Sequence, residues 1–242
     1  MNPRASALGA LGAIYAGLGA RDIFVRPGVS EADRALMRIA AVVGTGHTGP
    51  LLREALVDAL ANALTGVQVE DLIIHLASYV GLARAHDAMH ALAATLKALE
   101  HEHDVTTSSD AHADKPMAQR FEAGMAQYAR LDGPRARQQL SFYGSLSPDY
   151  YPYVMGMFGC TFDRPSLDVR SREIATVAVL AAMGTAPNQL RFHARVALEQ
   201  GVAKDLLAEV LLHVQLFAGL PAANNAAAVL RDVFEADVKE TG

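Results

Sequence analysis

The sequence is poor in the residue types that mark several classes of protein. Among its 242 residues there is no tryptophan, only 6% are aromatic, and Cys160 is the single cysteine. One cysteine excludes a disulfide within the chain, and it also excludes a CxxC redox pair or a zinc ribbon built by this chain alone. This cysteine usage favours a cytoplasmic protein.

Long apolar runs and clustered positive charge are missing as well. No uninterrupted apolar stretch is long enough to cross a bilayer as a helix, so we expect no membrane partner. The formal net charge is −5 and no basic stripe is present, so we expect no nucleic-acid partner. Residues 1–22 are apolar, but glycines interrupt them and Arg4 alone precedes the apolar part, so a signal peptide is not expected.

The chain contains one pattern twice. EDLIIHLASYVG at 70–81 and AEVLLHVQLFAG at 208–219 each place a histidine, His75 or His213, in an apolar run that closes on glycine, 138 positions apart. Alanine-rich helices resemble one another, but that does not explain the glycines, arginines and Arg-Pro pairs that match at the same offset. Such fixed-period similarity is the signature of repeated units. The matched pairs include Arg26 with Arg164, Arg34 with Arg172, Gly46 with Gly184, Arg53 with Arg191 and Gly81 with Gly219.

Apolar residues recur at three- and four-residue spacing in both units, which predicts an all-α protein. In the second unit we predict a helix from Asp168 to Met183 that stops at Gly184, then helices after Pro187, over 204–218 and from Pro221. A further helix is predicted over 117–131. The predicted organisation is a degenerate N-terminal unit at 1–100, a polar linker at 101–116 and a C-terminal unit at 117–242 that carries the active site.

Residues 164–226 resemble the carboxymuconolactone decarboxylase family, whose members share the AhpD-like all-helical bundle. The resemblance rests on the RPSLDVRSRE entry, the HARVAL helix, and the LLH helix that runs into FAGLPAA. MAQRFEAGMAQYARL, from Met117, also resembles the start of the single-unit decarboxylases. The resemblance implies two tandem units of the AhpD-like fold in one chain.

The family has branches with different chemistry. The AhpD-type hydroperoxidases carry a CxxC four residues before a histidine, with a glutamate on the preceding helix. The equivalent positions here are Ala186 and Gln189 before His193, so thiol peroxide reduction is excluded. Glu173 and His193 remain, which is the decarboxylase-like pattern.

Glu173 and His193 lie at similar heights on two antiparallel helices, so contact between them is expected. A carboxylate beside an imidazole would raise the pKa of the imidazole and fix its tautomer, giving a general acid or base near neutral pH. We predict His193 as the catalytic proton donor and Glu173 as its orienting partner. Two plainer alternatives stay open: Glu173 favours the N-terminal end of its helix, and His193 is only a satisfied, partly buried side chain.

The positions 138 residues before this pair are Ala35 and Ala55, so the N-terminal unit is expected to be inactive and to supply pocket walls. His213 and His75 occur in both units, which favours a packing role. A pocket role for His213 beside His193 is the alternative, and His213 is a candidate substrate-binding residue.

Arginine is the expected partner of a carboxylated substrate because its guanidinium group binds carboxylates through two hydrogen bonds. Arg170 and Arg164 are the candidates. Arg164 has a counterpart in the inactive unit and so leans towards a structural role, whereas Arg170 faces Ala32 at the offset. Neither a metal nor a cofactor is expected: the HEHD run at 101–104 with His112, and the pair His86 and His90, lack a ligand geometry.

The resemblance implies a cofactor-independent 4-carboxymuconolactone decarboxylase-like enzyme of aromatic-compound catabolism in the protocatechuate/β-ketoadipate pathway. Its partner would be a small carboxylated lactone or related ring compound. A non-catalytic small-molecule-binding or scaffolding protein is the alternative. Single-unit relatives assemble as rings, so a two-unit chain is predicted to form a homotrimer.

Overall fold

The computed structural model describes residues 3–100, 114–132, 142 and 144–241, and its regular elements in these ranges are all helices. The predicted all-α helical bundle is confirmed. Residues 101–113, which hold most of the predicted linker, the HEHD run and His112, lie outside the described residues. In chain order the elements are α1 (Pro3–Tyr15), the π-helix η1 (Ala16–Ile23), α2 (Glu31–Thr45), α3 (Pro50–Asn62), α4 (Gly66–Val80), α5 (Leu82–Ala98), α6 (Met117–Asp132), α8 (Tyr150–Phe162), α9 (Val169–Met183), α10 (Pro187–Glu199), α11 (Lys204–Ala218) and α12 (Leu220–Thr241).

Capping residues set the ends of the two central helices. The Ser30 hydroxyl accepts a hydrogen bond from the Asp33 backbone N–H at the start of α2, and the Asp168 carboxylate accepts one from Ser171 at the start of α9. At the other ends, Gly46 and Gly184 take left-handed φ values of 79° and 68°, which glycine adopts at little cost. The bounds predicted for the helix ending at Met183 are confirmed.

The N-terminal half (residues 3–100) and the C-terminal half (residues 114–241) follow one helical plan. At the offset of 138 residues, α2 has the same bounds as α9 and α4 the same bounds as α11. Helices α5 and α12 also begin at equivalent positions, Leu82 and Leu220. This correspondence is what duplication would leave, and a common origin of the halves stays a prediction.

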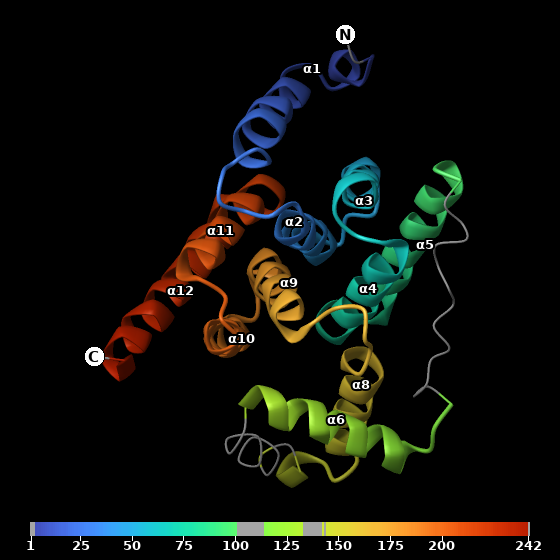
Figure 1. Cartoon of the computed structure of the whole chain (residues 1–242), viewed down its shortest axis with the longest axis vertical. Helices are drawn as coiled ribbons and strands as arrows, with labels where there is room; N and C mark the ends of the chain where they lie inside the picture. The colour runs from blue at the N-terminus through green and yellow to red at the C-terminus, as the bar shows by residue number, and fades with distance from the viewer. Residues whose placement is uncertain (1–2, 101–113, 133–141, 143, 242) are drawn as a thin grey trace.

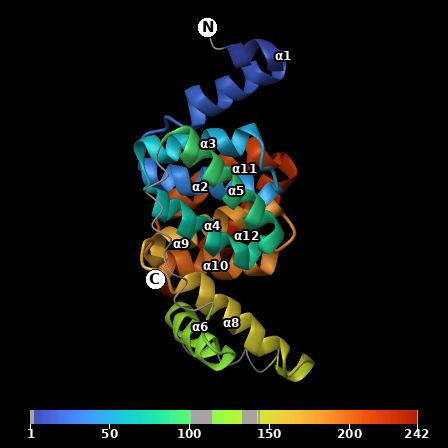
Figure 2. The same ribbon diagram turned by 90° about the vertical axis from the view of Figure 1, so that its right-hand side faces the viewer.

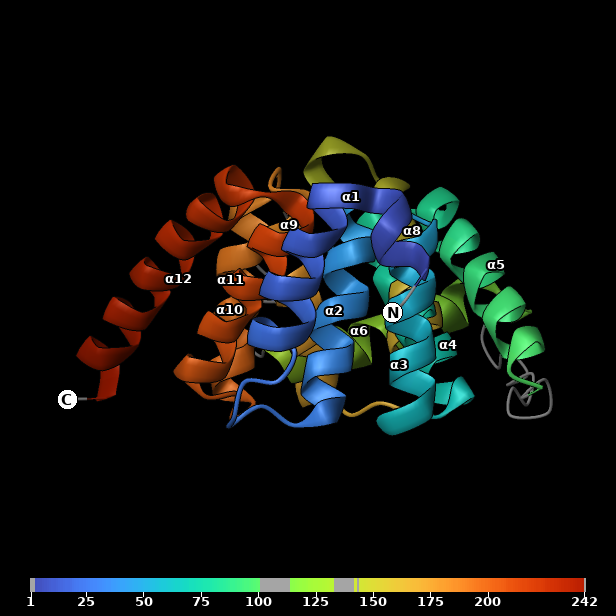
Figure 3. The same cartoon turned by 90° about the horizontal axis from the view of Figure 1, so that it is seen from above.

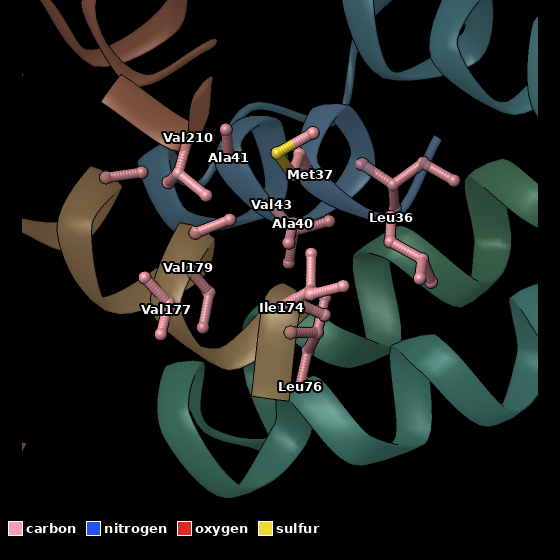
Figure 4. Packing of buried hydrophobic residues seen from close by; sticks show 14 of the residues in the cluster. Leu36, Met37, Ala40, Ala41, Val43, Leu76, Ile174, Val177, Val179 and Val210 are labelled. Carbon is pink, nitrogen blue, oxygen red and sulfur yellow. The ribbon is translucent and has the colours of Figure 1, made fainter. Parts of the chain in front are cut away.

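Helices α2 and α9 lie side by side at the centre of the molecule. Helices α3 to α5 flank them on one side and α10 to α12 on the other (Figures 1 and 3). Both central helices are buried on nearly every face, which explains their apolar sequences. Figure 4 shows the contact, where Ala40 of α2 lies next to Ile174 of α9. A side chain at Gly44 would place its Cβ 2.9 Å from the Val179 carbonyl oxygen, so glycine permits this close crossing.

Each central helix also contacts an α4-type helix of the opposite half. Helix α4 packs against α9, and α11 packs against α2. Helix α11 packs against α9 of its own half as well, so the two halves share covering helices at the centre.

Two ion pairs at equivalent positions connect the N-terminal half to the C-terminal half. Asp71 of α4 is buried and accepts hydrogen bonds from the Arg164 guanidinium and the Ser166 backbone N–H. Its counterpart at the offset is Glu209, which pairs with Arg26 at 2.9 Å in an exposed setting. The sequence favours a structural role for Arg164, and its buried ion pair with Asp71 agrees with such a role.

The two ends of the molecule carry helical projections. Helices α1 and η1 extend at one end and the α6–α8 pair at the other (Figure 2). Helices α6 and α8 approach closely because Gly124 and Gly159 face each other's helix, and a Cβ at either position would overlap the opposite backbone. Within the described ranges, no helix combines the length and apolar character needed to cross a bilayer.

Replacing Asp71 by Asn should lower the free energy of unfolding by about 3 kcal/mol, because it removes the buried carboxylate charge that the Arg164 guanidinium contacts. The matched control is Asp232→Asn, which breaks the half-exposed pair with Arg191 and should cost less than about 1 kcal/mol. Urea denaturation followed by circular dichroism measures both. Equal effects of the two variants would contradict a fastening role for Asp71.

Candidate functional site

Glu173 and His193 come together in the C-terminal half. Glu173 lies in the second turn of α9 and His193 in the middle of α10, and their side chains face each other across the two helices. His193 Nδ1 lies 2.8 Å from Glu173 Oε2. Glu173 is 0% exposed and His193 6% exposed. The predicted contact between these side chains is confirmed, and their catalytic roles stay a prediction.

This geometry fixes the tautomer of the imidazole. An ionised carboxylate only accepts hydrogen bonds, so Nδ1 must carry the proton that Glu173 Oε2 accepts. In the neutral ring Nε2 is then the acceptor, and in the charged ring both nitrogens donate.

The second carboxylate oxygen, Glu173 Oε1, is buried and has no hydrogen-bond partner among the described residues. A buried acceptor without a donor costs free energy, so a residue kept only for packing would rarely be left in this state. This favours a functional role for the pair over a purely structural one.

Residues of the N-terminal half complete the surroundings of the pair. The Tyr79 hydroxyl of α4 lies 3.4 Å from His193 Nε2, with the two rings edge to face at 5.2 Å. One turn earlier on the same helix, His75 Nε2 lies 2.8 Å from the Thr176 hydroxyl of α9. Sequence reasoning missed Tyr79. A signal was available, since its counterpart at the offset is Phe217, which lacks the hydroxyl.

Aromatic rings form the remaining neighbourhood of the imidazole. The ring of Phe192 meets His193 edge to face at 4.9 Å and stacks with Tyr128 at 6.2 Å. Phe158 and Phe162 of α8 stack on each other at 3.7 Å, and Phe162 contacts His75. The polar groups therefore lie in an apolar setting, where electrostatic interactions are stronger than in water.

Burial shifts the titration of two of these groups. Desolvation, with the nearby Glu173 carboxylate, raises the pKa of Tyr79 well above its usual value, so the phenol keeps its proton at neutral pH. Desolvation, with the positive charge of Arg172, lowers the pKa of His75 well below 6.5, so this ring is neutral. Since the Thr176 hydroxyl donates to the Arg172 carbonyl, the His75 Nε2–H donates to Thr176.

The equivalent place in the N-terminal half is a cavity. Ala35 and Ala55, the counterparts of Glu173 and His193, both line a hollow of about 210 Å³. Arg38 replaces Thr176 there, and its guanidinium bonds to Tyr15, Glu54 and Asp58. This half has the frame of the site without its acid–base pair.

The predicted place of His213 beside His193 needs correction. His213 stacks on Phe24 at 5.8 Å, its Nδ1–H donates to the Glu209 carbonyl at 3.2 Å, and it lies near Arg34 and Arg38 of α2. It therefore borders the cavity half rather than the Glu173–His193 pair. Helix α11 contacts both α9 and α2, but its His213 lies by Phe24 and the arginines of α2. The histidine that reaches α9 is His75 of α4, which contacts Thr176.

The two candidate arginines are held by carboxylates of the N-terminal half. Arg164 pairs with buried Asp71, and the Arg170 guanidinium makes two hydrogen bonds, of 2.8 and 3.1 Å, with Asp33. Arg170 is 38% exposed at its side chain, so it is the more accessible of the two. Their binding of a substrate carboxylate stays a prediction, and it would have to compete with these aspartates.

No group of three or more potential metal ligands converges within the ranges that the structure describes. The rings of His86 and His90 meet edge to face at 4.5 Å on α5, with His86 exposed. Two histidines without a third ligand do not make a defined site.

Known proteins match the part of the chain that holds Glu173 and His193. The model of the carboxymuconolactone decarboxylase family matches residues 148–232, from just before α8 into α12. The 4-carboxymuconolactone decarboxylase of Acinetobacter baylyi is 33% identical over 119 residues, which are 48% of this chain and 88% of that protein. The uncharacterized 15.0 kDa protein in the nqo9-nqo10 intergenic region of Paracoccus denitrificans is 34% identical over 84 residues, 34% of this chain and 63% of that protein.

The burial of His213 predicts a dependence of stability on pH. Desolvation lowers the pKa of His213 to about 4, so between pH 4 and 6.5 the unfolded chain binds more protons than the folded chain. This contribution is complete above pH 6.5 and is lost as the pH falls towards 4. Between pH 7 and pH 5 it amounts to about 2 kcal/mol.

We expect the His213→Gln variant to lose about 2 kcal/mol less than the wild type when unfolding is measured at pH 7 and then at pH 5. The difference between the two slopes isolates His213, because His75 titrates in both proteins. Parallel pH profiles would contradict the burial of a neutral imidazole at this position.

Proposed function

The chain belongs to the carboxymuconolactone decarboxylase family, and we propose from this membership that it is a cofactor-independent carboxy-lyase of small carboxylated lactones such as 4-carboxymuconolactone. The observation that carries the proposal is the buried pair of Glu173 and His193, joined at 2.8 Å, with one carboxylate oxygen unpartnered among the described residues. The pair lies inside the stretch that matches the family.

The chemistry asks for a proton donor in a protected place. When the bond to the carboxyl carbon breaks, carbon dioxide leaves and the electron pair delocalises through the ring double bond onto the lactone carbonyl. The resulting dienolate needs a hydrogen-bond donor at its oxygen and then a proton at carbon. The net reaction consumes one proton and needs neither an oxidant nor a reductant.

In this scheme His193 supplies the proton and Glu173 stabilises the charged imidazole. A buried carboxylate that accepts the Nδ1–H hydrogen bond keeps the ring oriented. The low polarity around Phe192 and Phe158 keeps bulk water from competing with the substrate for the same hydrogen bonds.

The proposal is tested by following 4-carboxymuconolactone by ultraviolet absorbance with the wild type and with His193→Ala. Loss of the proton donor should lower kcat at least about 100-fold, and Glu173→Gln should lower it by a smaller factor. The matched control is His47→Gln, which removes an exposed histidine between α2 and α3 and should leave kcat unchanged. No turnover of any carboxylated lactone by the folded wild type would contradict the enzyme and favour a non-catalytic small-molecule-binding protein.

Two further properties are proposed for the protein, its cellular location and its oligomeric state. We propose a cytoplasmic location, because a chain with the single cysteine Cys160 has no disulfide within it to stabilise its fold. We also propose that copies associate through the end projections, because α1 and α8 expose large apolar side chains such as Leu11, Ile14 and Tyr153.

Light scattering coupled to size exclusion tests the assembly. A homotrimer of 25.7 kDa chains would have a mass of about 77 kDa. The double variant Leu11→Ser and Ile14→Ser should shift the mass towards the single chain. A monomeric wild type would contradict the trimer.

A further inference from the structure

Both nitrogens of the His193 imidazole are already engaged. Nδ1 bonds to Glu173 at 2.8 Å, and Nε2 faces the Tyr79 hydroxyl at 3.4 Å. The ring is 6% exposed, so a substrate meets little of it directly. A group that exchanges a proton with His193 in this arrangement has to do so at Nε2, through the position that Tyr79 occupies.

Tyr79 is the least enclosed residue of the three. The residue as a whole is partly buried, whereas His193 is 6% exposed and Glu173 behind the imidazole is completely buried. The Tyr79 hydroxyl itself is desolvated and lies within hydrogen-bond reach of Thr176 as well as of His193. The separation of 3.4 Å is long for a hydrogen bond, and such bonds in ligand-free sites often shorten when the substrate binds. From Glu173 outwards, the order of groups is carboxylate, imidazole and phenol.

We propose that the Tyr79 hydroxyl is the group that delivers the proton to the substrate, and that His193 acts behind it by replacing that proton. The site is then built by both halves of the chain, since Tyr79 comes from α4 and the pair from α9 and α10. This inference rests on the proposed decarboxylase function and assigns the last step to a residue outside the stretch that matches the family.

In the proposed scheme one proton moves from His193 to Tyr79 for each proton that Tyr79 gives to the substrate. In the charged imidazole Nδ1–H donates to Glu173, Nε2–H donates to the Tyr79 oxygen, and the Tyr79 O–H points onwards. When carbon dioxide has left, the O–H bond of Tyr79 breaks and a C–H bond forms at the carbanion. The phenolate takes the Nε2 proton, and the neutral imidazole is recharged by one proton from solvent.

The environment of Tyr79 suits a donor. Its raised pKa keeps the phenol protonated at neutral pH, so the proton is present before the reaction begins. A buried phenolate beside Glu173 would be costly, and the adjacent Nε2 proton removes that cost as soon as the transfer occurs.

Tyr79 of the N-terminal half can be compared with the residue 138 positions later in the same chain. The counterpart of Tyr79 is Phe217, which packs against Tyr15 and Phe24 near the cavity lined by Ala35 and Ala55. The hydroxyl is thus present on the helix that faces the acid–base pair and absent on the helix that faces the alanines. Phenylalanine is also sterically acceptable in the same helix, which makes Tyr79→Phe a mild substitution.

The test compares Tyr79→Phe with the control Tyr151→Phe, in which the removed hydroxyl contacts Met125 at the far side of α8. If Tyr79 delivers the proton, Tyr79→Phe lowers kcat on 4-carboxymuconolactone about 100-fold with KM changed less than about threefold. Tyr151→Phe keeps the wild-type values. A Tyr79→Phe enzyme whose kcat stays within about twofold of the wild type overturns the proposal.

A second measurement separates this inference from the proposed function. The ¹⁵N resonance of His193 Nε2 is recorded in histidine-labelled protein without substrate. The ¹⁵N chemical shift of Nε2 should change in Tyr79→Phe and stay at the wild-type value in Tyr151→Phe. If the wild type turns over no carboxylated lactone, the proposed function fails and the resonance alone decides whether Tyr79 controls the imidazole. A wild-type Nε2 resonance typical of a nitrogen without a hydrogen bond overturns it, even if the Tyr79→Phe protein does not fold.

Discussion

The contact between α2 and α9 is the constraint from which the rest of the structure follows. Because Gly44 lets the two backbones approach, both helices become almost completely enclosed and must be covered on every side. Each is covered partly by a helix of the opposite half, α4 over α9 and α11 over α2. Glu173 is buried by this enclosure, and the same enclosure brings Tyr79 and His75 to a pair that lies more than ninety positions away in the chain.

Much of the fold and the central pair could be predicted from the sequence because their determinants are local. Asp168 and Gly184 mark the ends of α9, and the heights of Glu173 and His193 on antiparallel helices indicate that they meet. The covering helices could not be assigned in this way. The apolar runs around His75 and His213 are nearly alike, so neither says which central helix it contacts. Helix α11 contacts both central helices, and only the structure shows that His213 lies by Phe24 and the arginines of α2.

The two halves keep the same frame and differ in the groups it encloses. Arg34 and Arg172 each donate hydrogen bonds to three backbone carbonyls at equivalent positions, which holds the segment before each central helix. This explains why these arginines match across the repeat although neither serves the acid–base chemistry. The enclosed positions differ between the halves: one half has a carboxylate, an imidazole and Thr176, and the other has two alanines and Arg38.

The hollow beside Ala35 and Ala55 has a practical consequence for protein engineering. It occupies the place that Glu173 and His193 occupy in the other half, and α11 packs against the α2 helix that borders it. Transplanting a second reaction centre would require side chains at only a few points: a glutamate and a histidine at the alanines, a tyrosine in place of Phe217, and a smaller residue where Arg38 now fills the floor. One chain would then carry two such acid–base groups, and the proposed activity of each could be measured separately.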